Sequence, residues 1–185
     1  MNKRVIEYKE FTGLVAKICR DISNSDWRPD YVVGLTRGGC LPAIMISHYF
    51  DIPCETLKVQ LRDGSECESN LWMAEEAFGH DGETVYYDGD PSRVRKPKKI
   101  LIVDDINDTG ATLNWIMEDW QSGCLPNDPR WSSVWNQNVR FAVVVDNLSS
   151  ECKVKMDYIG FEVNKAEDDV WIDFPYEDWW IKCGS

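Results

Sequence analysis

The residues best suited to chemistry stand together in the middle of the chain. The apolar run Ile100–Val103 is followed first by two adjacent acids and then by a polar stretch of small residues: Asp104, Asp105, Asp108, Thr109, Gly110, Ala111 and Thr112. Adjacent carboxylates can hold sugar hydroxyls or Mg²⁺. Backbone N–H groups at the start of a helix, together with threonine hydroxyls, form a cradle for a phosphate dianion. The combination predicts a site for a phosphorylated sugar.

Two other interpretations of this segment lead elsewhere. In the first, Asp108 or Thr109 only caps a helix and the acidic pair is solvated; this accounts for one acid, but not for three acids followed by T-G-A-T. In the second, Asp104 and Asp105 are the paired aspartates of a phosphoryl-accepting receiver domain. That pair is expected on the first strand of its fold, whereas here it lies past the midpoint of the chain.

A second segment has the composition of an anion-binding turn. The apolar run 31–35 is followed by Thr36, Arg37, Gly38 and Gly39. The Arg37 guanidinium is a charged fork that suits a diphosphate, and the two glycines let the backbone approach such a ligand. R-G-G after a strand is often only a turn. Its position, one strand–helix–strand unit before the acidic segment, makes it a predicted diphosphate loop.

The elements that must position these residues alternate along the chain. Continuous apolar runs predict strands buried on both faces, and apolar residues at helical spacing predict amphipathic helices. The predicted strands are 31–35, 56–59, 100–103, 141–145 and 158–163, and the predicted helices are 5–22, 41–50 and 113–120. This alternation predicts an α/β fold with a central, mostly parallel sheet flanked by helices. Ligands of such folds bind at the carboxyl edge of the sheet, which is where Asp104 and Asp105 are delivered.

The length of 185 residues predicts one domain, 1–185. Residues 62–98 are rich in Gly, Asp, Glu and Ser and predict a long functional loop. Residues 121–138 carry a glycine and two prolines and predict an irregular insertion.

Composition excludes several classes of protein. With 32 acidic and 20 basic residues the net charge is −12, so we expect no nucleic-acid partner. The sequence has no run of 18 apolar residues and no apolar signal segment near its start, so we expect no membrane partner and a cytoplasmic location. The seven cysteines are odd in number and form no C-x-x-C pair, which favours reduced thiols over a metal knuckle or a disulfide framework.

The two segments resemble the motifs of one known family. Residues 103–112 resemble the phosphoribosyl pyrophosphate (PRPP) motif of type I phosphoribosyltransferases, and residues 32–42 resemble the pyrophosphate loop of that family, particularly that of its xanthine-guanine members. Residues 158–162 resemble a segment of its hypoxanthine-guanine members. The resemblance spans roughly residues 5–60 and 98–180 and implies the type I fold, with a small C-terminal hood over 147–185. The long loop 62–98, which we expect to be flexible, and the insertion 121–138 lie outside the resemblance. The resemblance also implies the roles of the site residues. Asp104 and Asp105 hold the ribose, with Asp105 at Mg²⁺; Thr109, Gly110, Ala111 and Thr112 cradle the 5′-phosphate; Arg37, Gly38 and Gly39 hold the pyrophosphate.

The nature of the acceptor base depends on three further residues. Asp108 stands where members that act on 6-oxopurines carry an aspartate, which implies that it handles the N7 proton of the base. Residues 171–176 resemble the W-I-x-x-P-W segment of xanthine-guanine enzymes, which implies that Trp171 stacks on the purine and that Ile172 reads its edge through a backbone carbonyl. The alternatives are a helix-capping role for Asp108 and core packing for Trp171.

One departure from the family pattern concerns the base. Purine enzymes of this family carry a lysine soon after the strand 141–145, whereas this chain has Asp146 and Asn147 there. The Asn147 amide could donate to a purine or recognise a different base. Glu177 or Asp178 could help to hold Mg²⁺, or form a solvated acidic end.

The resemblance thus predicts an enzyme: a phosphoribosyltransferase that joins a purine base, preferably a 6-oxopurine, to PRPP. The products are a nucleoside 5′-monophosphate and pyrophosphate, in nucleotide salvage, with Mg²⁺ as cofactor and a dimer or tetramer as the assembly. Two alternatives stay open: transfer to a pyrimidine or modified base, and a regulatory module that senses PRPP or nucleotides without turnover.

Overall fold

The computed structural model describes residues 2–61, 66–67, 70–80 and 96–182. Its strands are β1 (Asn2–Val5), β2 (Tyr31–Thr36), β3 (Cys54–Gln60), β4 (Glu66–Cys67), β5 (Ile100–Asn107), β6 (Val139–Asn147), β7 (Tyr158–Val163) and β8 (Val170–Asp173). Its α-helices are α1 (Tyr8–Asn24), α2 (Cys40–Phe50), α3 (Leu71–Phe78), α4 (Ala111–Gly123) and α5 (Trp179–Lys182), and a 3₁₀ helix spans Pro129–Ser133.

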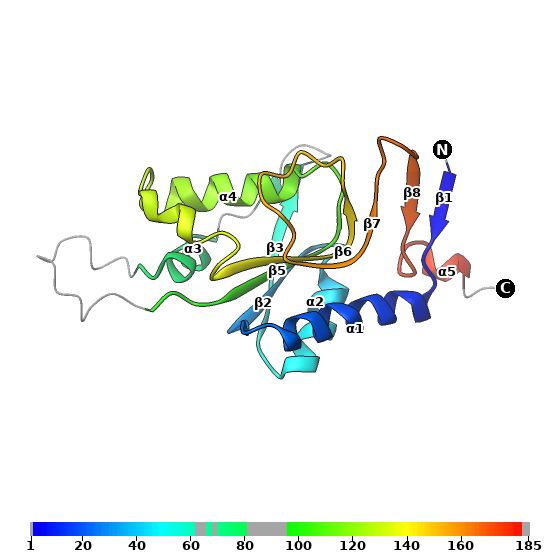
Figure 1. The fold of residues 1–185 in the computed structure, drawn as a ribbon, viewed down its shortest axis with the longest axis horizontal. Helices are drawn as coiled ribbons and strands as arrows, with labels where there is room; N and C mark the ends of the chain where they lie inside the picture. The colour runs from blue at the N-terminus through cyan, green and yellow to red at the C-terminus, as the bar shows by residue number, and fades with distance from the viewer. Residues whose placement is uncertain (1, 62–65, 68–69, 81–95, 183–185) are drawn as a thin grey trace, which may run out of the picture.

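Six strands form the central sheet in the order β4-β3-β2-β5-β6-β7. All neighbours are parallel except β4, which runs antiparallel to β3. Helices α1 and α2 cover one face and α3 and α4 the other (Figure 1). The prediction of a mostly parallel sheet flanked by helices is confirmed.

Strand β5 lies at the centre of the sheet because its first four residues are apolar on both faces. Residues 100–103 are all at most 1% exposed, and they divide between the two core clusters. On one side Phe11, Val15 and Ile18 of α1 pack at helical spacing. On the other side lie Ile116 and Trp120 of α4.

Part of the predicted long loop is ordered structure. Residues 71–78, placed by the sequence analysis in the loop 62–98, form α3, whose Met73, Ala74 and Ala77 are buried in the core. The polar composition around this short segment hid its apolar face. Residues 62–65, 68–69 and 81–95, where flexibility was predicted, lie outside the described residues. In the predicted insertion 121–138, α4 continues to Gly123, and Trp131 of the 3₁₀ helix is buried in the core.

The chain starts with a strand that the helical spacing of Val5 and Ile6 concealed. Residues 2–5 pair in parallel with β8, in the register Asn2↔Val170, and form a separate two-stranded sheet. Figure 1 places this small sheet at one end of the molecule, beyond β7. The region predicted as a hood from the C-terminal segment alone thus includes the N-terminal residues as well.

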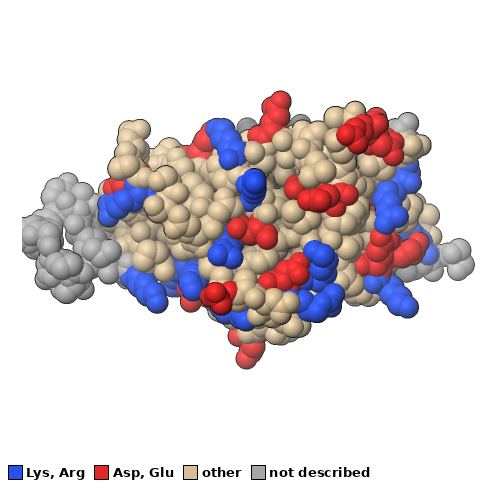
Figure 2. Space-filling model, viewed as in Figure 1, with Lys and Arg blue, Asp and Glu red and all other residues tan. Residues whose placement is uncertain are grey.

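None of the helices in the described ranges has the length and apolar character needed to cross a bilayer. On the face drawn in Figure 2, acidic and basic side chains are interspersed and do not form a continuous basic stripe.

Two lysines form ion pairs with a buried acid at the end of β8 in the small sheet. Asp173 is 4% exposed and pairs with Lys3 Nζ at 3.0 Å and Lys182 Nζ at 3.1 Å. Burial alone would raise the pKa of Asp173, but hydrogen bonds from Lys3 and Lys182 outweigh it and hold that pKa below its usual value. Because the lysines are partly exposed, solvent screens part of the attraction.

We predict that Asp173→Asn lowers the free energy of unfolding by about 1–2 kcal/mol at neutral pH, measured by urea denaturation. The stabilisation is full above the unfolded-state pKa of about 3.9 and is lost as the pH falls through the lower folded-state value, so the difference from the parent protein should narrow below about pH 4. Asp21→Asn, which breaks an exposed pair with Lys17, is the matched control and should change the stability by less than about 0.5 kcal/mol. Equal losses of stability in Asp173→Asn and Asp21→Asn would show that the ion pairs of the buried Asp173 stabilise the fold no more than an exposed pair does.

Candidate active site

Two loops meet at the carboxyl edge of the central sheet. Strand β2 ends in the loop Arg37–Gly39 before α2, and β5 ends in the segment Asp104–Gly110 before α4. The two strands are direct parallel neighbours, with Gly34 opposite Val103. The parallel register therefore places the predicted diphosphate loop beside the predicted sugar-phosphate segment.

One cavity of about 1030 Å³ lies at this edge. It is lined by almost every residue that the sequence analysis singled out: Arg37, Gly38, Asp104, Asp105, Asp108, Thr109, Gly110, Ala111, Thr112, Trp171 and Ile172. Gly39 and Asn147 are the exceptions; Gly39 packs beneath the cavity against β5. Glu177 and Asp178 also line the cavity, although Glu177 Oε2 is already engaged by the Phe174 N–H at 3.0 Å.

The absence of a side chain at Gly39 is what lets the first loop approach β5. A Cβ at this position would lie 2.2 Å from the Val103 carbonyl oxygen and 2.9 Å from the Asp104 Cα. Both are backbone atoms, so neither can move away by a change of side-chain rotamer. The start of α2 therefore rests directly on the strand that carries the acidic pair.

The second loop leads into α4 through Gly110, whose φ of +84° is in the left-handed region that favours glycine. A Cβ there would also lie 2.4 Å from the Cys152 backbone nitrogen. The hydroxyl of the exposed Thr109 accepts from the Ala111 N–H at 3.3 Å. The first N–H groups of an α-helix have no partner within the helix, so the start of α4 offers donors to an anion in the cavity.

The acidic pair is partly buried and electrically coupled. Burial raises the pKa of Asp104 well above its usual value, and the charge of Asp105 raises it further. The Asp105 N–H donates to Asp104 Oδ1 at 2.9 Å, and Asp105 Oδ1 accepts from the Ile106 N–H at 2.9 Å. Burial and the neighbouring charge thus favour the protonated form of the Asp104 carboxyl.

Cys40 lies at the start of α2 near this pair, but it is a poor nucleophile. Burial raises the pKa of its thiol, and the charges of Asp104 and Asp105 act in the same direction. The cysteines at positions 19, 40, 54, 124 and 152 are all free, as expected for reduced thiols.

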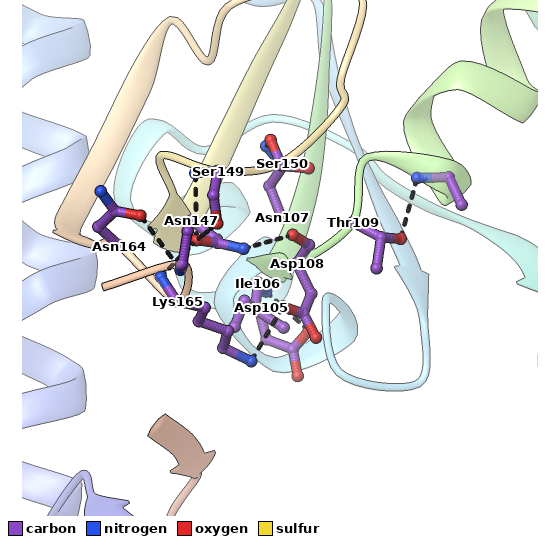
Figure 3. Close-up of polar contacts among 12 residues, drawn as sticks. Asp105, Ile106, Asn107, Asp108, Thr109, Asn147, Ser149, Ser150, Asn164 and Lys165 are labelled. Atoms are coloured by element: carbon purple, nitrogen blue, oxygen red, sulfur yellow. Dashed lines mark hydrogen bonds and ion pairs between the residues drawn. The ribbon is translucent and has the colours of Figure 1, made fainter. Parts of the chain in front are cut away.

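The cavity is also lined by a lysine, Lys165, that the sequence analysis did not identify. Lys165 lies just after the end of β7, and its Nζ is 2.9 Å from Asp108 Oδ1 (Figure 3). Its side chain is 17% exposed and that of Asp108 26%, so the pair is largely shielded from water. The signal that could have found it is positional: Lys165 follows a strand parallel to β6, and therefore lies at the same edge as Asp104 and Asp105.

Asn147 stands where purine enzymes of the family carry a lysine, but its side chain makes other contacts. It is 5% exposed and does not line the cavity. Its Nδ2 donates to the Asp108 carbonyl at 2.8 Å, and its Oδ1 accepts from the Lys165 N–H at 3.0 Å and from Ser149 (Figure 3). The prediction that Asn147 could read the base is therefore wrong, because its amide is used to hold Asp108 and Lys165 side by side.

Trp171 and Ile172 come to the cavity on β8. Trp171 is 45% exposed although it lines the cavity, so it is not packed in the core. Ile172 is 5% exposed and belongs to the core cluster beneath. A half-exposed indole that lines a polar cavity suits a planar heterocycle.

We predict that Gly39→Ala lowers the free energy of unfolding by about 3 kcal/mol, because the new methyl group meets backbone that cannot yield. Thermal or urea unfolding measures the change. Gly13→Ala is the matched control: nothing lies within 4 Å of its Cβ, and the helical position should gain about 0.5–1 kcal/mol. A Gly39→Ala variant as stable as the parent would show that α2 does not rest on β5 as described.

The comparisons with known proteins agree with this geometry. Xanthine phosphoribosyltransferase 1 of Saccharomyces cerevisiae is 24% identical over 136 residues, which are 64% of this chain and 60% of the length of that curated relative. Among solved structures, a purine phosphoribosyltransferase from Pyrococcus horikoshii matches with a TM-score of 0.61 and 22% identity over 95% of this chain and 94% of that one. The xanthine-guanine-hypoxanthine phosphoribosyltransferase of Helicobacter pylori matches with a TM-score of 0.64 and 17% identity over the full length of both chains.

These structural likenesses establish the fold, and the match to a protein family establishes the family to which the chain belongs. The family described as phosphoribosyl transferase domain matches residues 4–179, which include both loops, β8 and all of the cavity lining except Lys3 and Trp180. The chain therefore belongs to the phosphoribosyl transferase family.

Proposed function

We propose that the protein transfers the 5-phosphoribosyl group of PRPP to a purine base, with 6-oxopurines preferred. The products are a nucleoside 5′-monophosphate and pyrophosphate. One observation carries the proposal: a single cavity is lined by an arginine–glycine loop, an acidic pair, a helix start, an Asp108–Lys165 pair and a half-exposed indole. Each of these groups has a counterpart in the two substrates.

The groups at the first part of the cavity suit PRPP. Arg37 offers a cationic fork to the diphosphate, and the backbone at Gly38 and Gly39 can approach it closely. Residues 109–112 at the start of α4 suit the 5′-phosphate. Asp104 and Asp105 line the same cavity, where they can accept from the ribose hydroxyls and stabilise the positive charge that develops at the anomeric carbon.

The acidic pair also fits Mg²⁺ that arrives with the diphosphate. In the described ranges, no three His, Cys, Asp or Glu side chains are grouped to hold a metal by themselves. Mg²⁺ commonly binds through one or two carboxylates together with substrate phosphates and water, so Asp105, with Asp104 beside it, is sufficient on the protein side. When bound, the ion would neutralise charge on the leaving pyrophosphate.

The Asp108–Lys165 pair is complementary to one edge of a 6-oxopurine. On that edge the N7 position and the exocyclic oxygen are neighbours, and Asp108 and Lys165 present an acceptor and a donor 2.9 Å apart. An exocyclic amine in place of the oxygen would turn its N–H groups toward the Lys165 ammonium, which can only donate. This arrangement favours hypoxanthine, guanine and xanthine over adenine.

Transfer follows from these positions. The N9 lone pair of the base bonds to the anomeric carbon as the bond to pyrophosphate breaks, and the N7 proton passes to the Asp108 carboxylate. Trp171 holds the ring by stacking, and the Ile172 backbone lies at its edge. Most of the rate would come from positioning and charge stabilisation, without a covalent intermediate. A cytoplasmic location and a homo-oligomeric assembly are part of the same proposal.

The direct test is pyrophosphate release from Mg²⁺-PRPP with guanine, hypoxanthine, xanthine, adenine, orotate and uracil supplied separately. We expect turnover with the 6-oxopurines, and a fall of at least about tenfold in kcat/KM for these bases in Lys165→Met, with a smaller change for adenine. Lys153→Met is the control, because Lys153 is exposed and lies outside the cavity. Binding of PRPP without turnover on any base would instead support the sensing module.

Asp108→Asn tests the proton-handling role. We expect kcat to fall by about 10²-fold or more, because general acid–base catalysis typically contributes that much. The affinity for PRPP, measured by calorimetry, should change little, since the phosphate and ribose groups are intact. Unchanged turnover in this variant would remove Asp108 from the mechanism.

A further inference from the structure

Tyr176 connects the C-terminal segment to the acidic pair. Its hydroxyl donates to Asp105 Oδ2 at 2.6 Å, across a sequence separation of 71 residues. It lies in the turn between β8 and α5 and lines the same cavity as Asp105. Neither the diphosphate loop nor the phosphate cradle depends on this residue, so the mechanism described above leaves its hydroxyl without a role.

The ring of Tyr176 is held in place by two other rings. It stacks on Phe174 with the centroids 5.5 Å apart and the planes at 8°. Phe11 of α1 packs edge-on against it, with the centroids 5.8 Å apart, and also edge-on against Phe174. Both phenylalanines are at most 2% exposed. The hydroxyl therefore projects from a rigid base in the core.

The Asp105 carboxylate is held from three directions. Tyr176 donates to Oδ2, and the Ile106 N–H donates to Oδ1. On a third side lies the backbone of the diphosphate loop, so close that a Cβ on Gly38 would be 1.9 Å from Oδ2. A carboxylate held in this way has little freedom left to lose when it binds a ligand.

The direction of this hydrogen bond is fixed by chemistry. A tyrosine hydroxyl is protonated at neutral pH, so it donates to the carboxylate, which can only accept. A carboxylate oxygen has two lone pairs, so Oδ2 can accept from Tyr176 while the carboxylate still accepts from another hydroxyl.

We propose that Tyr176 is a positioning residue, whose hydroxyl fixes the Asp105 carboxylate in the orientation in which it accepts from the ribose of PRPP. The proposal rests on the proposed function and extends it. It assigns to the C-terminal segment, which presents Trp171 to the base, a second role on the sugar side of the cavity.

The test is Tyr176→Phe, which removes the hydroxyl and keeps the ring stack with Phe174 and Phe11. We expect the dissociation constant for PRPP, measured by calorimetry with Mg²⁺ present, to rise about tenfold or more, as is typical for losing a hydrogen bond to a charged group. The KM for PRPP should rise in parallel, while the KM for the 6-oxopurine and the unfolding temperature change little. That split distinguishes positioning of Asp105 from general support of the fold.

Tyr158→Phe is the matched control. It removes a phenolic hydroxyl that bonds to Arg140 at 2.8 Å and does not line the cavity, so its affinity for PRPP should equal that of the parent. Parental affinity in Tyr176→Phe, or equal weakening in both variants, would overturn the proposal. Failure of the parent protein to bind PRPP would instead overturn the proposed function, and the role of Tyr176 with it.

Discussion

The parallel pairing of β2 and β5 is the constraint on which the rest of the site depends. It brings the ends of two strands, far apart in sequence, to one edge of the sheet. The backbone contact between Gly39 and Val103 then sets how close the two loops come. If this approach were wider, Arg37 and Asp105 would line separate surfaces, and no single cavity could hold both ends of a phosphorylated sugar diphosphate.

The lining of the cavity combines groups that suit anions with groups that suit cations or hydroxyls. Arg37 and the start of α4 provide positive potential and backbone donors in a chain whose net charge is −12. The acidic pair lines the same cavity and adds acceptors to it, so the lining is not suited to phosphate alone. Burial raises the pKa of Asp104, and the same shielding from water strengthens the electrostatic interactions of the pair with a ligand.

Much of the fold could be predicted from the sequence because strand β5 is apolar on both faces and its neighbours alternate with helices. The prediction failed where local pattern and tertiary pairing disagree. The predicted helix 5–22 includes Val5 because of its apolar spacing, but residues 2–5 form β1 because β8 offers them a partner. The apolar face of α3 lies in a stretch whose overall composition is that of a loop. Neither the pairing of β1 with β8 nor the burial of α3 in the core can be recognised from the local sequence.

Only the part of the site that consists of contiguous motifs could be predicted from the sequence. The acids, the arginine–glycine loop and T-G-A-T are local patterns, and all of them come to the same edge of the sheet. Lys165 and Tyr176 act on Asp108 and Asp105 from distant parts of the chain, and only the folded register brings them there. Asn147 was misjudged because its side chain points inward, an orientation that a sequence does not state.

The pairing of Asn2 with Val170 has a consequence for how the molecule assembles. Closing so long a loop costs more conformational entropy than forming any of the neighbouring β–α–β units, so the small sheet should be among the last parts to form. Until it does, Trp171 has no fixed place. A chain arrested at that stage would have the cavity lining that comes from the ends of β2 and β5 and would lack the lining that comes from β8.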